Sequence, residues 1–219
     1  MKPAKKRKAK PFPQPPKDER LGQIYQVAAR IIHEKGYETT SLNDIAKAAG
    51  LTKSGLYHYV SSKESLLYEA MNYGMDLVEA DVLGPARLVD DPTERLRTLV
   101  RAYANLIMTE RQEITIIINE ANGLNVKLRN KIRARRHIFY NFVGDTIRKI
   151  KDEGNIAVLD VGVTTLNFVG SLVWLAYWYR PEGRLSKEQV TEELVELLVD
   201  RLVGVSLPLK HKSGVAGKP

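Results

Sequence analysis

The sequence has no cysteine and only four histidines among its 219 residues. Without thiols the chain cannot form disulfides, thiolate metal sites or a cysteine nucleophile. It also lacks a glycine-rich phosphate loop, an H-E-x-x-H pair and any grouping of nucleophile, base and orienting residue. We therefore expect a protein that is not an enzyme and that holds no metal and no cofactor.

An apolar signal-peptide core is also missing from the N-terminus, so we expect a cytoplasmic protein. One uncharged run, residues 161–179, is long enough to span a membrane. Two glycines and several polar side chains oppose that interpretation: Thr164, Thr165, Asn167 and Ser171. A helix that is apolar all round is otherwise a buried helix. We interpret the run as a helix between a pocket and a partner subunit. A membrane-tethered protein is the alternative, and cell fractionation tests it.

The remaining composition, 43% hydrophobic and 27% charged, is typical of a soluble globular protein with a core. Apolar residues recur at helical spacing along most of the chain, which predicts an all-α fold. Residues 114–124 include a β-branched run, but no partner strand is evident, so we predict a buried helix ending at Gly123. Asp91 followed by Pro92 marks another helix start. Further helices are expected over 18–35, 63–82 (broken by Gly84–Pro85), 126–153 and 187–203.

The net charge of +8 is concentrated at one end of the chain. Residues 1–17 hold seven Lys or Arg and no acid, and the rest of the chain has a net charge of only +1. This segment is too rich in Lys and Pro to fold alone. Two interpretations stay open: an arm that contacts DNA phosphates, or a solvated tail without specific contacts.

Residues 39–67 predict two short helices joined by a tight turn, with a third helix following. Ser41 and Asp44 can form a capping box at the first helix, and Gly50 suits its end. Thr52 can cap the second helix, and Ser61 with Glu64 is a second candidate box. This is the layout of a helix-turn-helix, whose second helix enters the major groove of DNA.

The second of these helices carries side chains that suit phosphate oxygens and base edges. They are Thr52, Lys53, Ser54, Tyr57, His58 and Tyr59, and Gly55 among them would let the backbone approach the duplex. The simpler interpretation is a three-helix packing unit that binds no nucleic acid.

The same stretch resembles the DNA-binding signature of TetR-type transcriptional regulators over about thirty positions, which makes the signal specific. The matching residues are Thr40, Asp44, Ile45, Ala46, Ala49, Gly50, Leu51, Thr52, Gly55, Leu56, Tyr57, Tyr59, Lys63, Glu64 and Leu66. Val60 departs from the pattern, in which phenylalanine is commoner. The resemblance implies that Thr40 and Lys63 contact phosphates and that Thr52–His58 reads the groove.

The resemblance also implies the organisation of the whole chain. It predicts a helix-turn-helix domain over 18–67 and a helical effector-binding and dimerisation domain over 68–204, between the arm (1–17) and a flexible tail (205–219). The expected protein is a homodimeric transcriptional regulator, most often a repressor in this family, bound to a palindromic operator. In a twofold dimer the half-sites lie roughly 34 Å apart. A carrier or enzyme that kept the fold but lost DNA binding is the rival class.

Two local motifs extend the resemblance to TetR-type repressors of steroid and fatty-acid breakdown, whose effectors are acyl-CoA thioesters. They are Asn119–Glu120–Ala121, of which Glu120 is itself a candidate effector-binding residue, and Trp178–Tyr179–Arg180–Pro181, with Gly183 just beyond. An acyl chain needs an apolar tunnel, for which the candidates are Tyr103, Ile117, Phe139, Phe142, Phe168 and Trp174.

The coenzyme's phosphates need cations, and the candidates lie on one predicted helix: Arg135 and Arg136, or the neighbouring Arg129 and Arg133. The alternatives are that Arg135 and Arg136 pair with acids such as Glu120, that the aromatic residues are plain core, or that the effector is a free hydrophobic or aromatic ligand.

Overall fold

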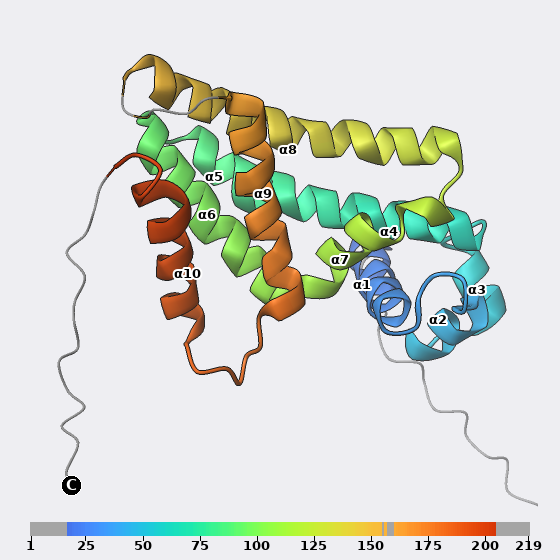
Figure 1. Ribbon diagram of the computed structural model, residues 1–219. Helices are drawn as coiled ribbons and strands as arrows, with labels where there is room; N and C mark the ends of the chain where they lie inside the picture. Colours follow the sequence, from blue (N-terminus) through green and yellow to red (C-terminus); the bar gives the residue numbers. More distant parts are fainter. Residues whose placement is uncertain (1–16, 155, 157–159, 205–219) are drawn as a thin grey trace, which may run out of the picture. The chain divides into compact units, whose positions relative to one another are not determined.

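The computed structural model describes residues 17–154, 156 and 160–204. All the regular elements in these ranges are helical, as Figure 1 shows, so the all-α fold is confirmed. The arm before Lys17 and the tail after Gly204 lie outside the described residues. The chain forms two compact units, one containing residues up to Asp76 with Gln112–Ala134, the other Leu77–Arg111 with residues from Arg135 onward. The units therefore do not divide at residue 67, the predicted domain boundary.

The first unit contains the three N-terminal helices, α1 (Lys17–Lys35), α2 (Leu42–Ala48) and α3 (Lys53–Tyr57), and nearly all of α4 (Lys63–Leu77). It also contains α7 (Arg111–Asn119) from its second residue, a 3₁₀ turn (Ala121–Gly123) and the start of α8 (Val126–Asp152). The predicted helix over 114–124 is thus α-helical to Asn119 and 3₁₀ thereafter. The core of this unit consists of fully buried apolar side chains: Ile24, Ile32, Ile45, Leu56, Leu66, Leu67, Met71 and Ile116.

The predicted break at Gly84–Pro85 is wrong. After α4 the chain continues as a π-helical turn (Val78–Leu83) and then as α5 (Gly84–Arg87), with Pro85 in the first turn of α5. Proline lacks an N–H and its ring crowds the preceding turn of an α-helix. We attribute the uninterrupted helix to the wider π turn, which changes the hydrogen-bond spacing immediately before the proline.

The second unit is built around α6 (Pro92–Thr109), which Asp91 caps by accepting a hydrogen bond from the backbone N–H of Glu94 at 2.7 Å. Helix α6 contacts α5, α9 (Val161–Trp178) and α10 (Lys187–Val195), as can be followed in Figure 1. A second π-helical turn (Glu196–Asp200) extends α10. The predicted helix over 187–203 is therefore regular only in its first half.

Helix α9 has one buried face and one exposed apolar face. Phe168, Leu172 and Leu175 are buried, and Thr165 approaches Gly144 of α8 closely enough that a Cβ there would lie 3.2 Å from the Thr165 hydroxyl oxygen. By length and composition α9 passes the test for a membrane span, with 33% of its residues buried. Its exposed side carries large apolar residues: Val163, Leu166, Trp174 and Trp178. The exposed apolar side is available for the expected partner subunit, whereas the side expected to face a pocket is buried in the core.

Candidate DNA-binding and effector sites

Helix α2 is fixed by the capping box that the sequence predicts. The Ser41 hydroxyl accepts a hydrogen bond from the backbone N–H of Asp44 at 3.2 Å, and the Asp44 carboxylate accepts one from the backbone N–H of Ser41 at 3.0 Å. The Ser41 hydroxyl also donates a hydrogen bond to the Asp44 carboxylate at 2.6 Å, and this bond, followed by the one from the Ser41 N–H, lowers the pKa of Asp44 because both favour its charged form. Gly50 has a φ of 66°, in the left-handed region where glycine is favoured. The chain therefore turns sharply between α2 and α3.

Helix α3 presents its polar side chains to solvent. The Thr52 hydroxyl caps it by accepting a hydrogen bond from the backbone N–H of Gly55 at 2.9 Å. Leu56 anchors the helix in the core with 1% exposure, whereas Tyr57 is 49% exposed. The side chains of Thr52, Lys53, Ser54 and His58 are exposed as well. The predicted groove-reading residues are thus together on the surface of one capped helix.

Thr40 and Lys63, the two expected phosphate contacts, differ in their accessibility. The side chain of Thr40 is buried, at 2% exposure, and its hydroxyl donates a hydrogen bond to the backbone carbonyl of Gly36 at 2.8 Å. Lys63 is half-buried: its Nζ donates to the carbonyl of Glu38 at 3.1 Å and lies 4.3 Å from the centroid of the Tyr37 ring. Only Lys63 presents a cation near the surface, so we drop the Thr40 side chain as a phosphate contact.

The cap of α4 is not the predicted Ser61–Glu64 pair. Ser62 and Ser65 form it instead: the Ser65 N–H donates to the Ser62 hydroxyl at 3.0 Å, and the Ser62 N–H donates to the Ser65 hydroxyl at 2.9 Å. The Glu64 carboxylate accepts a hydrogen bond from the backbone N–H of Asn125, at 2.5 Å. The start of α4 is thereby tied to the residue that precedes α8.

The second unit brings together several of the residues predicted for the effector. Tyr103 and Phe139 are buried and stacked, with ring centroids 5.0 Å apart. Burial raises the pKa of Tyr103, nearby Tyr140 raises it further, and the charge of Arg136 opposes the rise. Sequence reasoning missed Tyr140, which adjoins Phe139 and carries no motif. Phe168 is buried on α9.

Other predicted effector residues lie elsewhere. Trp174 is 61% exposed on the outer face of α9 and stacks on Tyr177, with centroids 4.9 Å apart, so it lines no interior tunnel of a single chain. Phe142 is half-buried, with the Arg87 guanidinium 5.9 Å from its ring centroid. Ile117 and Glu120 belong to the first unit, where Ile117 packs against Gly74. Arg135 is half-buried.

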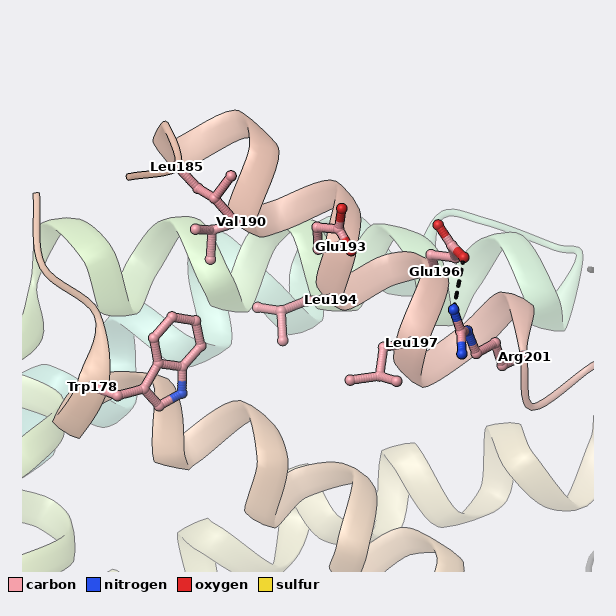
Figure 2. Close-up of a pocket in the computed structure, with 8 residues that line it drawn as sticks. All are labelled: Trp178, Leu185, Val190, Glu193, Leu194, Glu196, Leu197 and Arg201. Atoms are coloured by element: carbon pink, nitrogen blue, oxygen red, sulfur yellow. Dashed lines mark hydrogen bonds and ion pairs between the residues drawn. The ribbon is translucent and has the colours of Figure 1, made fainter. Parts of the chain in front are cut away.

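An apolar groove runs between the end of α9 and α10, with a volume of about 240 Å³. Figure 2 shows the Trp178 indole at one end and the Glu196–Arg201 ion pair at the other, with Leu194 and Leu197 between them. A second groove of about 400 Å³ lies along α9 and includes Val163 and Leu197. Both grooves adjoin the exposed apolar face of α9.

Comparison with known proteins identifies families and structures that this chain resembles. Residues 24–70 match the model of bacterial regulatory proteins of the tetR family, and residues 89–202 match that of a tetracyclin repressor-like C-terminal domain. The crystal structure of AibR in complex with isovaleryl coenzyme A and operator DNA is similar, with 37% identity and a TM-score of 0.77, covering 82% of this chain and 98% of that one.

The transcriptional repressor KstR2 of Mycobacterium tuberculosis is 27% identical over 189 residues, which are 82% of this chain and 91% of that protein. Its structure has a TM-score of 0.76, covering 84% of this chain and 95% of the other. These relatives are regulators rather than enzymes. The chain belongs to the TetR family, as a DNA-binding, ligand-responsive transcriptional regulator.

Proposed function

We propose that this protein is a homodimeric repressor, located in the cytoplasm, that binds a palindromic operator and is released from it by an acyl-CoA thioester. The observation that carries the proposal is the capped helix α3, whose exposed polar side chains have no role in the core of the first unit. The similarity to AibR, whose structure contains both isovaleryl coenzyme A and operator DNA, supports the same combination here.

For the operator, we propose that the polar residues Thr52–His58 read the major groove and that Lys63 contacts a phosphate. The described part of the helix-turn-helix region has no net positive charge, because residues 18–75 contain six basic and seven acidic side chains, a net charge of −1. Docking therefore depends on the placement of single groups and on other sources of positive charge.

For the effector, we propose that the acyl group lies against the buried aromatic pair Tyr103–Phe139. We propose further that Arg136 and Arg135 bind the coenzyme's phosphates. Tyr103 is 5% exposed and Phe139 4% exposed, so a ligand there would be shielded from water. Arg136 and Phe139 are three residues apart on α8, so they are neighbours on its surface, and the charge of Arg136 opposes the rise in the pKa of Tyr103. A cation therefore adjoins an apolar cluster. That combination suits a molecule with an apolar end and an anionic end.

The decisive experiment is a titration of acyl-CoA thioesters of increasing chain length into the complex of the protein with its upstream DNA. We expect release by thioesters but not by the matching free acids or by coenzyme A alone. Release by the free acids instead would identify a free hydrophobic ligand. If no CoA ester releases DNA even well above micromolar concentrations, the acyl-CoA proposal is wrong, and the DNA-binding assignment stands independently.

For the dimer, we propose that the exposed apolar face of α9, with the end of α10, packs against its symmetry mate. Leu166, Trp174 and Leu197 are each about 60% exposed in the single chain (62%, 61% and 58%), which is costly for large apolar side chains that lie together. Gly170 lies on the same face, and a Cβ there would meet no atom within 4 Å in the single chain, so space is left for a partner.

A further inference from the structure

The first three turns of α8 carry several positive charges and no negative charge. Residues 121–144 contain six Lys or Arg and no Asp or Glu, whereas residues 18–76 contain six basic and eight acidic side chains. Outside residues 1–17, the positive charge of the first unit is therefore concentrated at the start of α8, at Lys127, Arg129, Lys131 and Arg133, rather than in the helix-turn-helix. A run of like charges on one helix is destabilising unless an anion offsets it.

Two of these cations lie on one exposed face. Lys127 and Lys131 are four residues apart, so they share a side of α8, and both are exposed. Lys131 Nζ lies 5.8 Å from the centroid of the Tyr68 ring on α4. Among the described residues Lys127 forms no ion pair. Glu64 is the nearby acid, and its carboxylate already accepts the hydrogen bond from the Asn125 N–H.

Two contacts set the register between α8 and α4. The Asn125 N–H bonds to Glu64, and Lys131 lies over the Tyr68 ring, so α8 and α4 run in the same direction. From Asn125 to Lys131 the chain advances six residues, about 9 Å of helix, and from Glu64 to Tyr68 it advances four residues, about 6 Å. The two segments therefore run nearly level with each other. Lys127 is therefore beside the first turn of α4, the turn that begins with Lys63.

We propose that Lys127, with Lys131 behind it, forms a second phosphate-binding element that extends the DNA contact from the start of α4 onto α8. The partner is the sugar–phosphate backbone of duplex DNA next to the phosphate assigned to Lys63, so this inference rests on the proposed docking. A lysine on a flexible stem suits a phosphate as a point charge and adds affinity without sequence preference.

The test measures affinity for a random duplex of about 30 base pairs, and for the upstream DNA, between about 50 and 200 mM salt. Lys127→Gln and the double variant with Lys131→Gln are compared with Lys149→Gln, which removes the same charge from an exposed position in the later part of α8. Each lost phosphate contact lowers the slope of log affinity against log salt by about 0.9, or about 1.8 for both subunits of a dimer. Lys127→Arg keeps the charge and should keep the slope.

The outcomes separate this inference from the docking it rests on. A lower slope for Lys127→Gln on both DNAs, with Lys149→Gln equal to the wild type, supports the α8 contact. If Lys63→Gln lowers the slope while Lys127→Gln behaves like Lys149→Gln, the α8 contact is wrong and the docking stands. If neither Lys63→Gln nor Lys127→Gln changes the slope, both are wrong.

Discussion

At the scale of single residues, Tyr57 is the sharpest test of the proposed DNA contact. Its side chain is 49% exposed, and Leu56 rather than Tyr57 anchors the helix in the core. We predict that Tyr57→Ala weakens operator binding by roughly tenfold or more, since a specific contact is worth about 1–3 kcal/mol, and leaves the melting temperature unchanged. Leu88→Ala, which trims an 85% exposed side chain in the second unit, is the control. Full operator affinity in a folded Tyr57→Ala protein would refute the docking.

Gly123 is a residue whose importance the sequence suggests only as a helix end. A Cβ at this position would lie 2.5 Å from the Tyr37 ring and 3.0 Å from a Leu67 methyl group. We predict that Gly123→Ala destabilises the protein by about 1–3 kcal/mol, because the ring and α4 must shift. Denaturant unfolding measures the change.

The matched control for that variant is Gly22→Ala in the middle of α1, where a Cβ would make only an ordinary contact, 3.8 Å from Tyr73. Alanine is the better helix former, so this change should stabilise by roughly 0.5–1 kcal/mol. Equal effects of the two substitutions would show that Gly123 is not closely packed.

At the scale of elements, the ion pair between α6 and the π-helical turn that follows α10 should hold the second unit together. Arg97 Nε donates to Asp200 at 2.7 Å, and the side chains are only 18% and 11% exposed. Burial lowers the pKa of Arg97, but its bonds to Asp200 and Glu94 outweigh that effect and raise it. We predict that Asp200→Asn costs about 2 kcal/mol, because a largely buried guanidinium loses the buried one of its two counter-charges and keeps only the exposed Glu94.

The exposed pair Arg101–Glu192 joins α6 to α10 itself and gives the comparison. Its side chains are 45% and 59% exposed, so solvent screens the pair even though its atoms are 2.8 Å apart. Glu192→Gln should therefore change the free energy of unfolding by less than about 0.5 kcal/mol. A larger loss from Glu192→Gln than from Asp200→Asn would contradict the assignment of α10 anchoring to Asp200.

The elements also show how far the sequence predicts this fold. Local signals were sufficient for the α2 box, the Thr52 cap and the Asp91–Pro92 start, because each depends on residues three positions apart. The α4 cap was misplaced by one residue, since Glu64 is used by Asn125, a partner 61 positions away. The π turns were not predicted, because a change in hydrogen-bond spacing leaves no pattern in the apolar periodicity. The turn before Pro85 is an example.

The two candidate sites also differ in how far the sequence predicts them. The sequence was sufficient to predict that the residues proposed to read the groove lie together, because they are consecutive on one short capped helix. The residues predicted for the effector are distributed over several helices and over both compact units, so the sequence indicated their chemical types but not which of them lie together. Trp174 illustrates this limit: it was predicted for the tunnel, but it lies on the outer face of α9.

At the scale of the whole molecule, that outer face is the basis of the last prediction. Leu166 and Trp174 are eight residues apart on α9 and both strongly exposed, so a charge at either would be buried in the proposed dimer. We predict that Trp174→Asp converts the protein to a monomer in sedimentation experiments. Operator affinity should fall by roughly a hundredfold or more, because one subunit can contact only one half-site. Ile138→Asp, which places the same charge at a 51% exposed position on α8, should leave both properties unchanged. If Trp174→Asp stays dimeric and binds the operator normally, the subunits associate through another surface.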